Sequence, residues 1–323
     1  MRKLASIAVT AGLLVALTAC SGTPFNPGGC TPEYAPGVNT AFVTADAGLG
    51  KDPKAEFPTP LVASDTQAEV ISEGDGDLVS VGDTVDVQIT IYDGATGEAL
   101  ISTDYAGSGL RLSAIDGQPA FGAIAECATV GSRVAAVGPA GELIGEAAIT
   151  ANGIPVTVDD TVVLVADVLR SFLGRADGAD QLAQAGFPSI VLAPDGRPGF
   201  TIPATDPPAD LRIAVLKAGN GATVEEGDPV VIHYTGVLWD SQSVFDSTWD
   251  RNAPTTLVAA DFTTTDDQSG VVPGFAQALI GQKVGSQVIV VIPPELGYPV
   301  GSAPSSIGEG ATLVFVFDVL GIE

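Results

Sequence analysis

The sequence predicts an α+β fold that is built twice along one chain. Residues 69–94 match residues 214–240 at a constant offset of 145. In the second copy, apolar residues alternate with their neighbours from Val230 onward, which is the spacing of a β-strand. Further on, apolar residues at i, i+3 and i+4 lie between Pro273 and Gly281, which predicts a short amphipathic helix. Each half is therefore expected to combine strands with a single helix.

Two further pairs of segments support the repeat. Residues 121–134 (FGAIAECATVGSRV) match 275–288 (FAQALIGQKVGSQV), and 162–169 (VVLVADVL) match 313–320 (LVFVFDVL). Self-similarity of this kind indicates that one structural unit occurs twice.

The first twenty residues predict an export signal. Arg2 and Lys3 precede an apolar run at 7–17, which is short for a membrane span, and the sequence Leu-Thr-Ala-Cys ends at Cys20. This looks like a bacterial lipobox, in which Cys20 is lipidated and becomes the mature N-terminus. The alternative is an ordinary signal peptide with an incidental cysteine. We expect a lipid anchor in the cell membrane and a protein that works on its extracytoplasmic side.

The remaining chain divides into four predicted parts. Residues 21–37 are rich in Pro, Gly and small residues and predict a flexible tether. Residues 38–173 and 188–323 are the two repeated domains. Residues 174–187 (GRADGADQLAQAGF) are the expected linker, whose Ala, Gln and Asp residues could form a short helix.

Composition limits the class of partner. The chain has 13 basic and 39 acidic residues, which give a net charge of −26. Such a surface repels nucleic acid and anionic membrane faces, so we predict no nucleic-acid partner and interpret the charge as solubility chemistry.

The cysteines predict one disulfide. If Cys20 carries lipid, Cys30 and Cys127 remain as a pair in an oxidising compartment, where a bridge is expected. The alternative is two buried thiols.

Five motifs in the second half carry a resemblance to a known family. They are IHYTG at 232–236, VFDSTWDRN at 244–252, VVPGF at 271–275, PPELGY at 293–298 and ATLVFVFDVL at 311–320. In this order they resemble the FKBP-type peptidyl-prolyl cis-trans isomerases, which are macrolide-binding foldases. The resemblance implies two tandem FKBP-like domains, each a twisted antiparallel sheet wrapped around one short helix, with a hydrophobic cleft between them.

The resemblance also implies the site residues. Asp246, Tyr234 and Tyr298 would be the catalytic groups, with Arg251 and the Tyr234 hydroxyl holding Asp246. The Val272 N–H and the Tyr298 hydroxyl would bind substrate carbonyls. The residues expected to bind the substrate are Phe245, Arg251, Val271, Val272, Phe275, Ile307 and Phe315.

The implied reaction explains why no other chemistry is expected. Rotation about an Xaa-Pro bond requires an amide to lose its planarity, which is slow without a catalyst but needs no nucleophile, metal or cofactor. We therefore predict no cofactor and no metal site. The expected ligands are proline-containing polypeptides and, by the resemblance, macrolide inhibitors.

Simpler interpretations remain for the same residues. The aromatic residues could be ordinary core, and Asp246 with Arg251 could be a solvated surface pair. His233, the sole histidine, is expected to be a surface residue on the opposite strand face and not a catalytic base. Thr255, Ser306, Pro299 and the extra segment 262–270 depart from the family pattern, and we expect them to loosen and polarise one rim of the cleft.

The first half lacks the polar groups of the site. Ile89 corresponds to Tyr234, Leu164 corresponds to Phe315, and no Phe-Asp-Ser motif is present. The expected function is thus an anchored isomerase of exported proteins whose activity is confined to the second half. The alternatives are a non-catalytic, proline-peptide-binding chaperone or adaptor and a structural surface lipoprotein.

Overall fold

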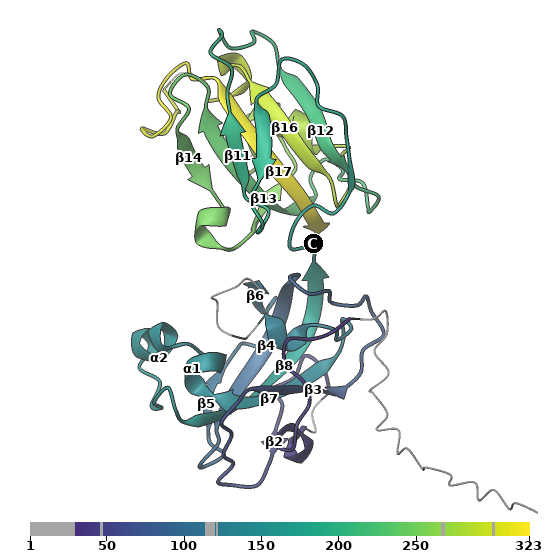
Figure 1. Cartoon of the computed structure of the whole chain (residues 1–323), viewed down its shortest axis with the longest axis vertical. Coiled ribbons are helices and arrows are strands. Elements are labelled where there is room, and N and C mark those ends of the chain that lie inside the picture. The colour runs from purple at the N-terminus through teal and green to yellow at the C-terminus, as the bar shows by residue number, and fades with distance from the viewer. Residues whose placement is uncertain (1–29, 46–47, 114–119, 121, 266–268, 299–300) are drawn as a thin grey trace, which may run out of the picture.

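The computed structural model describes residues 30–45, 48–113, 120, 122–265, 269–298 and 301–323. Two large antiparallel β-sheets follow each other along the long axis of the molecule, and the C-terminus lies between them (Figure 1). The predicted signal peptide with Cys20, and residues 21–29 of the predicted tether, lie outside the described residues.

The first half holds eight strands and two short α-helices within the described residues. The elements are η2 (Thr40–Phe42), β1 (Thr44–Ala45), β2 (Ala55–Glu56), β3 (Gln67–Ser72), β4 (Thr84–Asp93), β5 (Ala99–Ser102), β6 (Leu110–Ser113), η3 (Ala123–Ala125), β7 (Arg133–Pro139), α1 (Ala140–Leu143), α2 (Glu146–Asn152) and β8 (Thr161–Phe172).

The second half holds nine strands and one α-helix in the part of the chain that is described. The elements are β9 (Ala179–Asp180), β10 (Ser189–Leu192), β11 (Pro198–Thr201), β12 (Arg212–Ala218), β13 (Pro229–Leu238), β14 (Val244–Ser247), η4 (Trp249–Arg251), β15 (Thr255–Val258), α3 (Pro273–Leu279), β16 (Gln287–Ile292), η5 (Pro294–Leu296) and β17 (Leu313–Ile322).

The two large sheets have the same strand order. The first runs β3-β7-β8-β4-β5, with β6 also on β4, and the second runs β12-β16-β17-β13-β14, with β15 also on β13. Every pair in both sheets is antiparallel. The second sheet carries one further strand, because β9 pairs with the end of β12. The predicted α+β class, antiparallel sheets with few helices, is confirmed.

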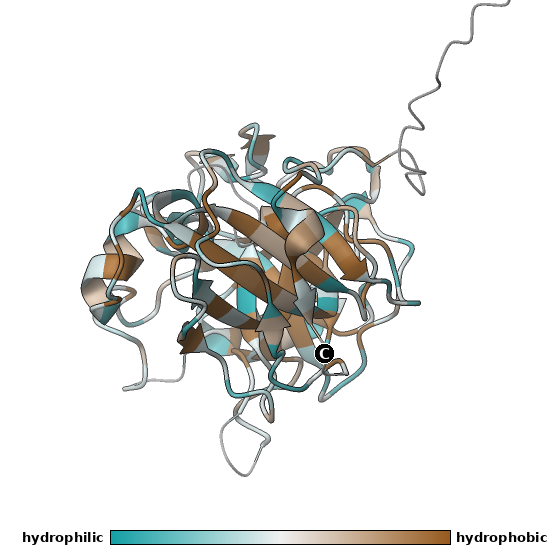
Figure 2. Ribbon diagram, turned by 90° about the horizontal axis from the view of Figure 1, so that it is seen from below, coloured by the Kyte–Doolittle hydropathy of each residue, from teal (hydrophilic) through white to brown (hydrophobic). Residues whose placement is uncertain are grey.

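The helix predicted in the second half is present as α3. Pro273 occupies its first turn, where a missing N–H costs nothing, and Gly281 follows its end with a φ of 85°. Phe275, Ala278 and Leu279 are buried against the sheet. Figure 2 shows that hydrophobic residues are concentrated along the strands and hydrophilic residues in the loops. Burial of this helix face fixes one wall of the cleft described below.

The single helix predicted for the first half is wrong in its position. At that point the chain forms only the turn η3, and the two helices α1 and α2 come later, after β7. The reason lies in the next two residues. Glu126 is extended and its carboxylate accepts the N–H groups of Glu33 and Gly82, while Cys127 has a φ of 63°, which cannot continue a right-handed helix.

The predicted disulfide between Cys30 and Cys127 is confirmed. Their Cα atoms are 5.6 Å apart and the bridge spans 97 residues of sequence. Closing a loop of this length stabilises the folded state by about 4–5 kcal/mol in the chain-entropy model. The bridge fastens the start of the described chain to the end of η3.

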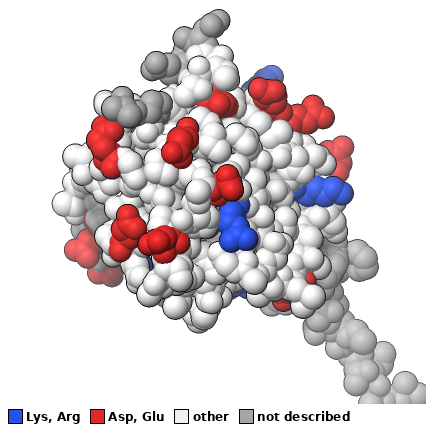
Figure 3. Space-filling view, turned by 90° about the horizontal axis from the view of Figure 1, so that it is seen from above, with Lys and Arg blue, Asp and Glu red and all other residues white. Residues whose placement is uncertain are grey.

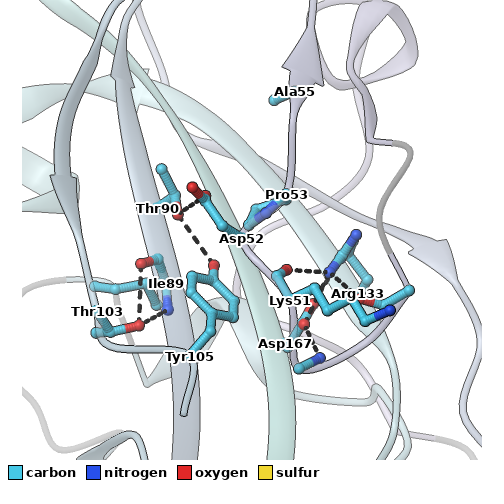
Figure 4. A network of polar contacts seen from close by, with 12 residues as sticks. Lys51, Asp52, Pro53, Ala55, Ile89, Thr90, Thr103, Tyr105, Arg133 and Asp167 are labelled. Carbon is cyan, nitrogen blue, oxygen red and sulfur yellow. Dashed lines mark hydrogen bonds and ion pairs between the residues drawn. The ribbon is translucent and has the colours of Figure 1, made fainter.

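Each half uses a buried aspartate to hold the segment that precedes its sheet. Asp167 on β8 pairs with Arg133 at 2.6 Å and accepts the Gly50 N–H at 2.7 Å. Figure 4 shows Arg133 between Asp167 and the Lys51 carbonyl. Asp318 on β17 accepts the Ala176 N–H at 2.9 Å and Gln287 Nε2 at 2.8 Å. These aspartates occupy equivalent places in the two sheets, so the repeat extends to the buried polar groups.

The segment 174–187 differs from the prediction, because it contains no helix. Its residues 179–180 form β9, and the Gly178 N–H bonds to the Gly285 carbonyl. Backbone hydrogen bonds to a neighbouring sheet replace the intrahelical bonds that the Ala and Gln residues could have made. Residues 179–180 of this segment are therefore part of the second sheet.

A polar network joins the two halves. Arg111 on β6 binds Asp86 through two hydrogen bonds, Thr256 on β15 at 2.7 Å and the C-terminal residue Glu323 at 2.6 Å. Beside it, Phe172 packs over Gly321, where a Cβ atom would come within 2.4 Å of the Phe172 ring. The contact between the halves thus combines charge pairs with a small apolar cluster.

Candidate active site

A cleft of about 250 Å³ lies between α3 and the second sheet. Its walls come from β13, β14, β15, β17, the start of α3 and the two loops on either side of the cleft. The lining residues are Tyr234, Phe245, Asp246, Leu257, Phe262, Gly270, Val271, Val272, Phe275, Tyr298 and Phe315. Such a concave, mostly apolar site with a few polar groups is typical of a small ligand or a single side chain.

Phe315 is the centre of the aromatic wall. Its ring meets Phe275 edge to face at 5.1 Å, Phe245 edge to face at 5.4 Å and Tyr234 at 6.0 Å. Phe275 and Phe315 are 3% and 7% exposed, so the base of the cleft is dry. Edge-to-face packing of this kind fixes ring orientations and leaves an apolar surface shaped for a ring.

Gly236 makes this packing possible. A Cβ atom on Gly236 would lie 2.5 Å from Cζ of Phe245 and 2.8 Å from Cε1 of Phe315. The glycine of the IHYTG motif therefore gives two rings the room to meet above β13. The sequence did not predict this role, although Gly236 belongs to one of the five motifs.

Asp246 is the charged group of the cleft. Its Oδ1 accepts a hydrogen bond from Arg251 Nη1 at 2.7 Å, and its Oδ2 accepts one from the Tyr234 hydroxyl. Partial burial raises the pKa of the carboxyl, but the hydrogen bonds from Arg251 and Tyr234, together with the Arg251 charge, outweigh it and hold the pKa below its usual value. Asp246 is therefore ionised at neutral pH, with its side chain 37% exposed at the rim.

The two tyrosines of the cleft keep their protons. Burial, and then the neighbouring Asp246, raise the pKa of Tyr234 to about 12. Burial and the same carboxylate also raise the pKa of Tyr298. Within the described residues, neither the Tyr298 hydroxyl nor the Val272 N–H has a hydrogen-bond acceptor in the protein. Both are donors open to a ligand carbonyl.

All the predicted site residues except Ile307 and Arg251 line the cleft. Ile307 does not line the cleft; it is half-buried and packs on the same core, and its N–H bonds to the Pro304 carbonyl in the loop before β17. Arg251 stands behind Asp246 as its ion-pair partner. Pro299 lies outside the described residues. Leu257, Phe262 and Gly270 are lining residues that sequence reasoning missed.

His233 corrects the expectation of a surface residue. It is fully buried, its ring stacks on Trp249 with centroids 4.1 Å apart, and its Nδ1 shares a hydrogen bond with the Thr248 hydroxyl. The opposite face of β13 is covered by η4 and its neighbours, which the alternating pattern alone does not reveal. Its ring faces away from the cleft, in agreement with the expectation that it is not a base.

Among the described residues of the first half, the positions equivalent to Tyr234 and Phe315 carry no polar group. Ile89 and Leu164 are both buried in its core, so the positions of Tyr234 and Phe315 are filled by aliphatic side chains. Among the described residues of the whole chain, no group of three or more metal-binding side chains gathers, and no helix has the length and apolarity that a bilayer crossing requires.

The fold and the cleft together define a class: an antiparallel sheet around a short helix, with an aromatic pocket, a tethered carboxylate and free backbone and hydroxyl donors. A family model described as FKBP-type peptidyl-prolyl cis-trans isomerase matches residues 221–320. The chain therefore belongs to the FKBP-type peptidyl-prolyl cis-trans isomerases, as the following relatives show.

Three relatives illustrate the similarity. An FK506-binding protein of Streptomyces anulatus is 33% identical over 127 residues, which cover 39% of this chain and 97% of that protein. A protein of Corynebacterium glutamicum named "Probable FK506-binding protein" is 35% identical over 126 residues, covering 38% and 97%. FK506-binding protein 2B of Rhizopus delemar is 38% identical over 122 residues, covering 36% and 55%.

Proposed function

We propose that the second half is a peptidyl-prolyl isomerase domain whose working groups are Asp246, Tyr234, Tyr298 and the Val272 N–H. The observation that carries this proposal is the carboxylate of Asp246, held by two donors at the rim of a dry aromatic cleft. A binding site for apolar peptides needs only the aromatic wall. A fixed charge beside the aromatic wall can stabilise an amide whose electron distribution changes as it twists, which is the change that catalysis requires.

The substrate would be held as follows. The prolyl ring packs on Phe275 and Phe315, which exclude water from one face of the amide. The Asp246 carboxylate faces the carbonyl carbon of the residue before proline, and the Tyr298 hydroxyl donates to the oxygen of that carbonyl. The carbonyl oxygen of proline itself accepts a hydrogen bond from the Val272 N–H. A twisted amide loses resonance and dipole, so an apolar floor and fixed groups around it stabilise the twisted form more than the planar one.

Substitution of Asp246 tests this assignment. Asp246→Ala should lower kcat/KM for Xaa-Pro peptides by about 10- to 100-fold, as expected for loss of one fixed electrostatic contact. Asp250→Ala is the matched control, because Asp250 lies four residues further on, is exposed and pairs with Arg197 outside the cleft. Full activity in the Asp246 variant would contradict the role assigned to Asp246, whereas peptide binding without turnover in the unchanged protein would favour a non-catalytic peptide-binding module.

The first half is proposed to be a degenerate FKBP-like domain without catalysis. The identical strand order of the two sheets and the equivalent aspartates 167 and 318 support a common scaffold. The aliphatic residues at the positions of Tyr234 and Phe315 support the loss of activity. In this proposal residues 38–173 form the first domain, and the second begins at 174 instead of 188, because β9 belongs to its sheet.

We further propose that the protein acts on exported polypeptides from a lipid anchor at Cys20. The disulfide in the first half supports an oxidising location. The acidic surface, visible on the face shown in Figure 3, argues against adsorption to anionic lipid by charge alone. Cys20→Ala should release the protein from membranes with its disulfide and thermal unfolding unchanged. A variant that still sediments with membranes in high salt would contradict the lipid anchor.

A further inference from the structure

One aromatic ring of the cleft, that of Phe262, comes from the extra segment 262–270 and not from the five sequence motifs. Thr255, on β15, shares a strand face with Leu257, yet only Leu257 lines the cleft. The aromatic ring on this side of the cleft belongs to Phe262, at the start of the extra segment. The described part of this rim therefore includes an aromatic ring.

The backbone fixes the position of Phe262. Its N–H donates to the Val271 carbonyl at 3.1 Å, and the Val271 N–H donates to the Ala260 carbonyl at 2.9 Å. Gly270 has a φ of 121°, and a Cβ atom there would lie 2.2 Å from the Ala260 carbonyl oxygen, so only glycine fits. The two ends of the extra segment are thus clamped together, and the ring of Phe262 is carried on this clamp.

The clamp lies next to the donor that would bind the carbonyl of proline. Val271, which pairs with Phe262, directly precedes Val272 and its free N–H. In the proposed orientation the residue before proline lies towards Asp246 and Tyr298, so the chain leaves the cleft past Val272. The first residue after proline then meets a wall made by Phe262, Leu257 and Val271, which is wholly apolar.

We propose that Phe262 is a specificity-determining residue that favours substrates with an apolar side chain immediately C-terminal to the proline. This inference rests on the proposed function, because it uses the same cleft and the same substrate direction. Burial of an aliphatic side chain against an aromatic wall favours it over a polar side chain of similar size, because the polar group would lose water without gaining a partner.

Two peptide series test the proposal. In the first, Xaa-Pro-Leu is compared with Xaa-Pro-Asn, since Leu and Asn differ little in size; in the second, only the residue before proline varies. Both kcat/KM and the peptide Kd are measured for the full chain. The unchanged protein should prefer Leu over Asn by about tenfold, and Phe262→Ala should reduce this ratio to about twofold. Phe262→Leu, which keeps an apolar wall, should retain most of the preference.

A matched control separates the site from a general effect of losing a ring. Phe42→Ala removes a phenylalanine that is 51% exposed in the first half, and it should leave the Leu/Asn ratio at the starting value. An unchanged ratio in Phe262→Ala, or an effect confined to the series that varies the residue before proline, would overturn the proposal. Peptide binding with the predicted ratio but without turnover would support the role of Phe262 while refuting the catalytic assignment.

Discussion

His233 and Asp318 form a buried cross-strand pair with opposite responses to protonation. They are register partners on β13 and β17, and both are almost completely buried. Burial lowers the pKa of His233 to about 4. Burial raises the pKa of Asp318 to about 6, only partly opposed by hydrogen bonds from Ala176 and Gln287. One group therefore resists gaining a proton, and the other resists losing one.

The signs of the two contributions are opposite. Between about pH 4 and 6.5 the unfolded chain binds a proton at His233 that the folded protein does not, so the folded state loses stability as the pH falls through this window. Between about pH 3.8 and 6 the folded protein binds a proton at Asp318 that the unfolded chain does not, so stability is lost as the pH rises through this window. The two effects nearly cancel.

His233→Gln should remove one side of this balance. Gln88 occupies the equivalent position in the first half, opposite Asp167, so the substitution has a precedent in the same chain. The free energy of unfolding of the variant, minus that of the unchanged protein, should increase by about 3 kcal/mol between pH 7 and pH 4, because only the unchanged protein must bury a neutral imidazole. Urea unfolding at a series of pH values measures this difference, and a value that does not vary with pH would refute it.

Phe315→Ala should lower both activity and stability. The substitution removes the ring that contacts Phe275, Phe245 and Tyr234, and truncation of a buried phenylalanine costs about 3–5 kcal/mol. Phe317→Ala is the control, since Phe317 is buried two residues further along β17 and packs on Phe275 but does not line the cleft. Both variants should be destabilised, and only Phe315→Ala should lose kcat/KM per folded molecule.

At this scale the sequence predicts the residues of the motifs but not their surroundings. Cleft residues such as Asp246 and Phe245 could be predicted because they belong to motifs that occur in the same order as in the family. The burial of His233 could not be foreseen, because it depends on η4 folding back over the far face of β13. Phe262 was missed because its role depends on how the extra segment closes on Val271.

At the scale of the element, β13 depends on a residue without a side chain. Gly236→Ala should push Phe245 and Phe315 apart, because the new methyl group would overlap both rings. We expect a loss of about 1–3 kcal/mol in stability, as for other overpacked sites, and a higher KM from a distorted cleft. Gly199→Ala on β11 is a suitable control, since its nearest neighbour is the Val191 carbonyl at 3.4 Å. Equal KM values in the two variants would contradict this account.

Strands were easier to predict than helices in this chain. Alternation of apolar residues places β13 and β17 because each strand forms a long, regular run. The helix of the first half was misplaced because its sequence resembles that of α3, whereas its end is set by the disulfide and by the contacts of Glu126 with Glu33 and Gly82. A long-range bond of this kind leaves no periodic signal.

At the scale of the whole molecule, the boundary between the halves can be tested with fragments. A fragment of residues 174–323 keeps β9 and the donor that Asp318 needs, whereas 188–323 leaves a buried carboxyl without its Ala176 partner. The shorter fragment should be less stable by at least about 1–3 kcal/mol, the usual cost of an unsatisfied buried group. Urea midpoints measure this difference, and equal midpoints would show that the segment 174–187 is only a linker.

The same fragments should divide the activity. Residues 174–323 should retain the kcat/KM of the full chain, because every described residue that lines the cleft lies within them. Residues 30–173 should have none, because Ile89 and Leu164 stand at the positions of Tyr234 and Phe315. Comparable activity in the two fragments would contradict the proposed division.

The buried stack of Trp249 on His233 makes the molecule its own optical reporter. The chain has two tryptophans, Trp239 and Trp249, and both are buried in the second half. Tryptophan fluorescence therefore follows the thermal unfolding of the second half alone, while circular dichroism follows both halves. Removing the contacts of Arg111 with Glu323 and Thr256 should separate the midpoints of the two melting curves. The difference between the midpoints then measures how strongly the two halves are coupled in unfolding.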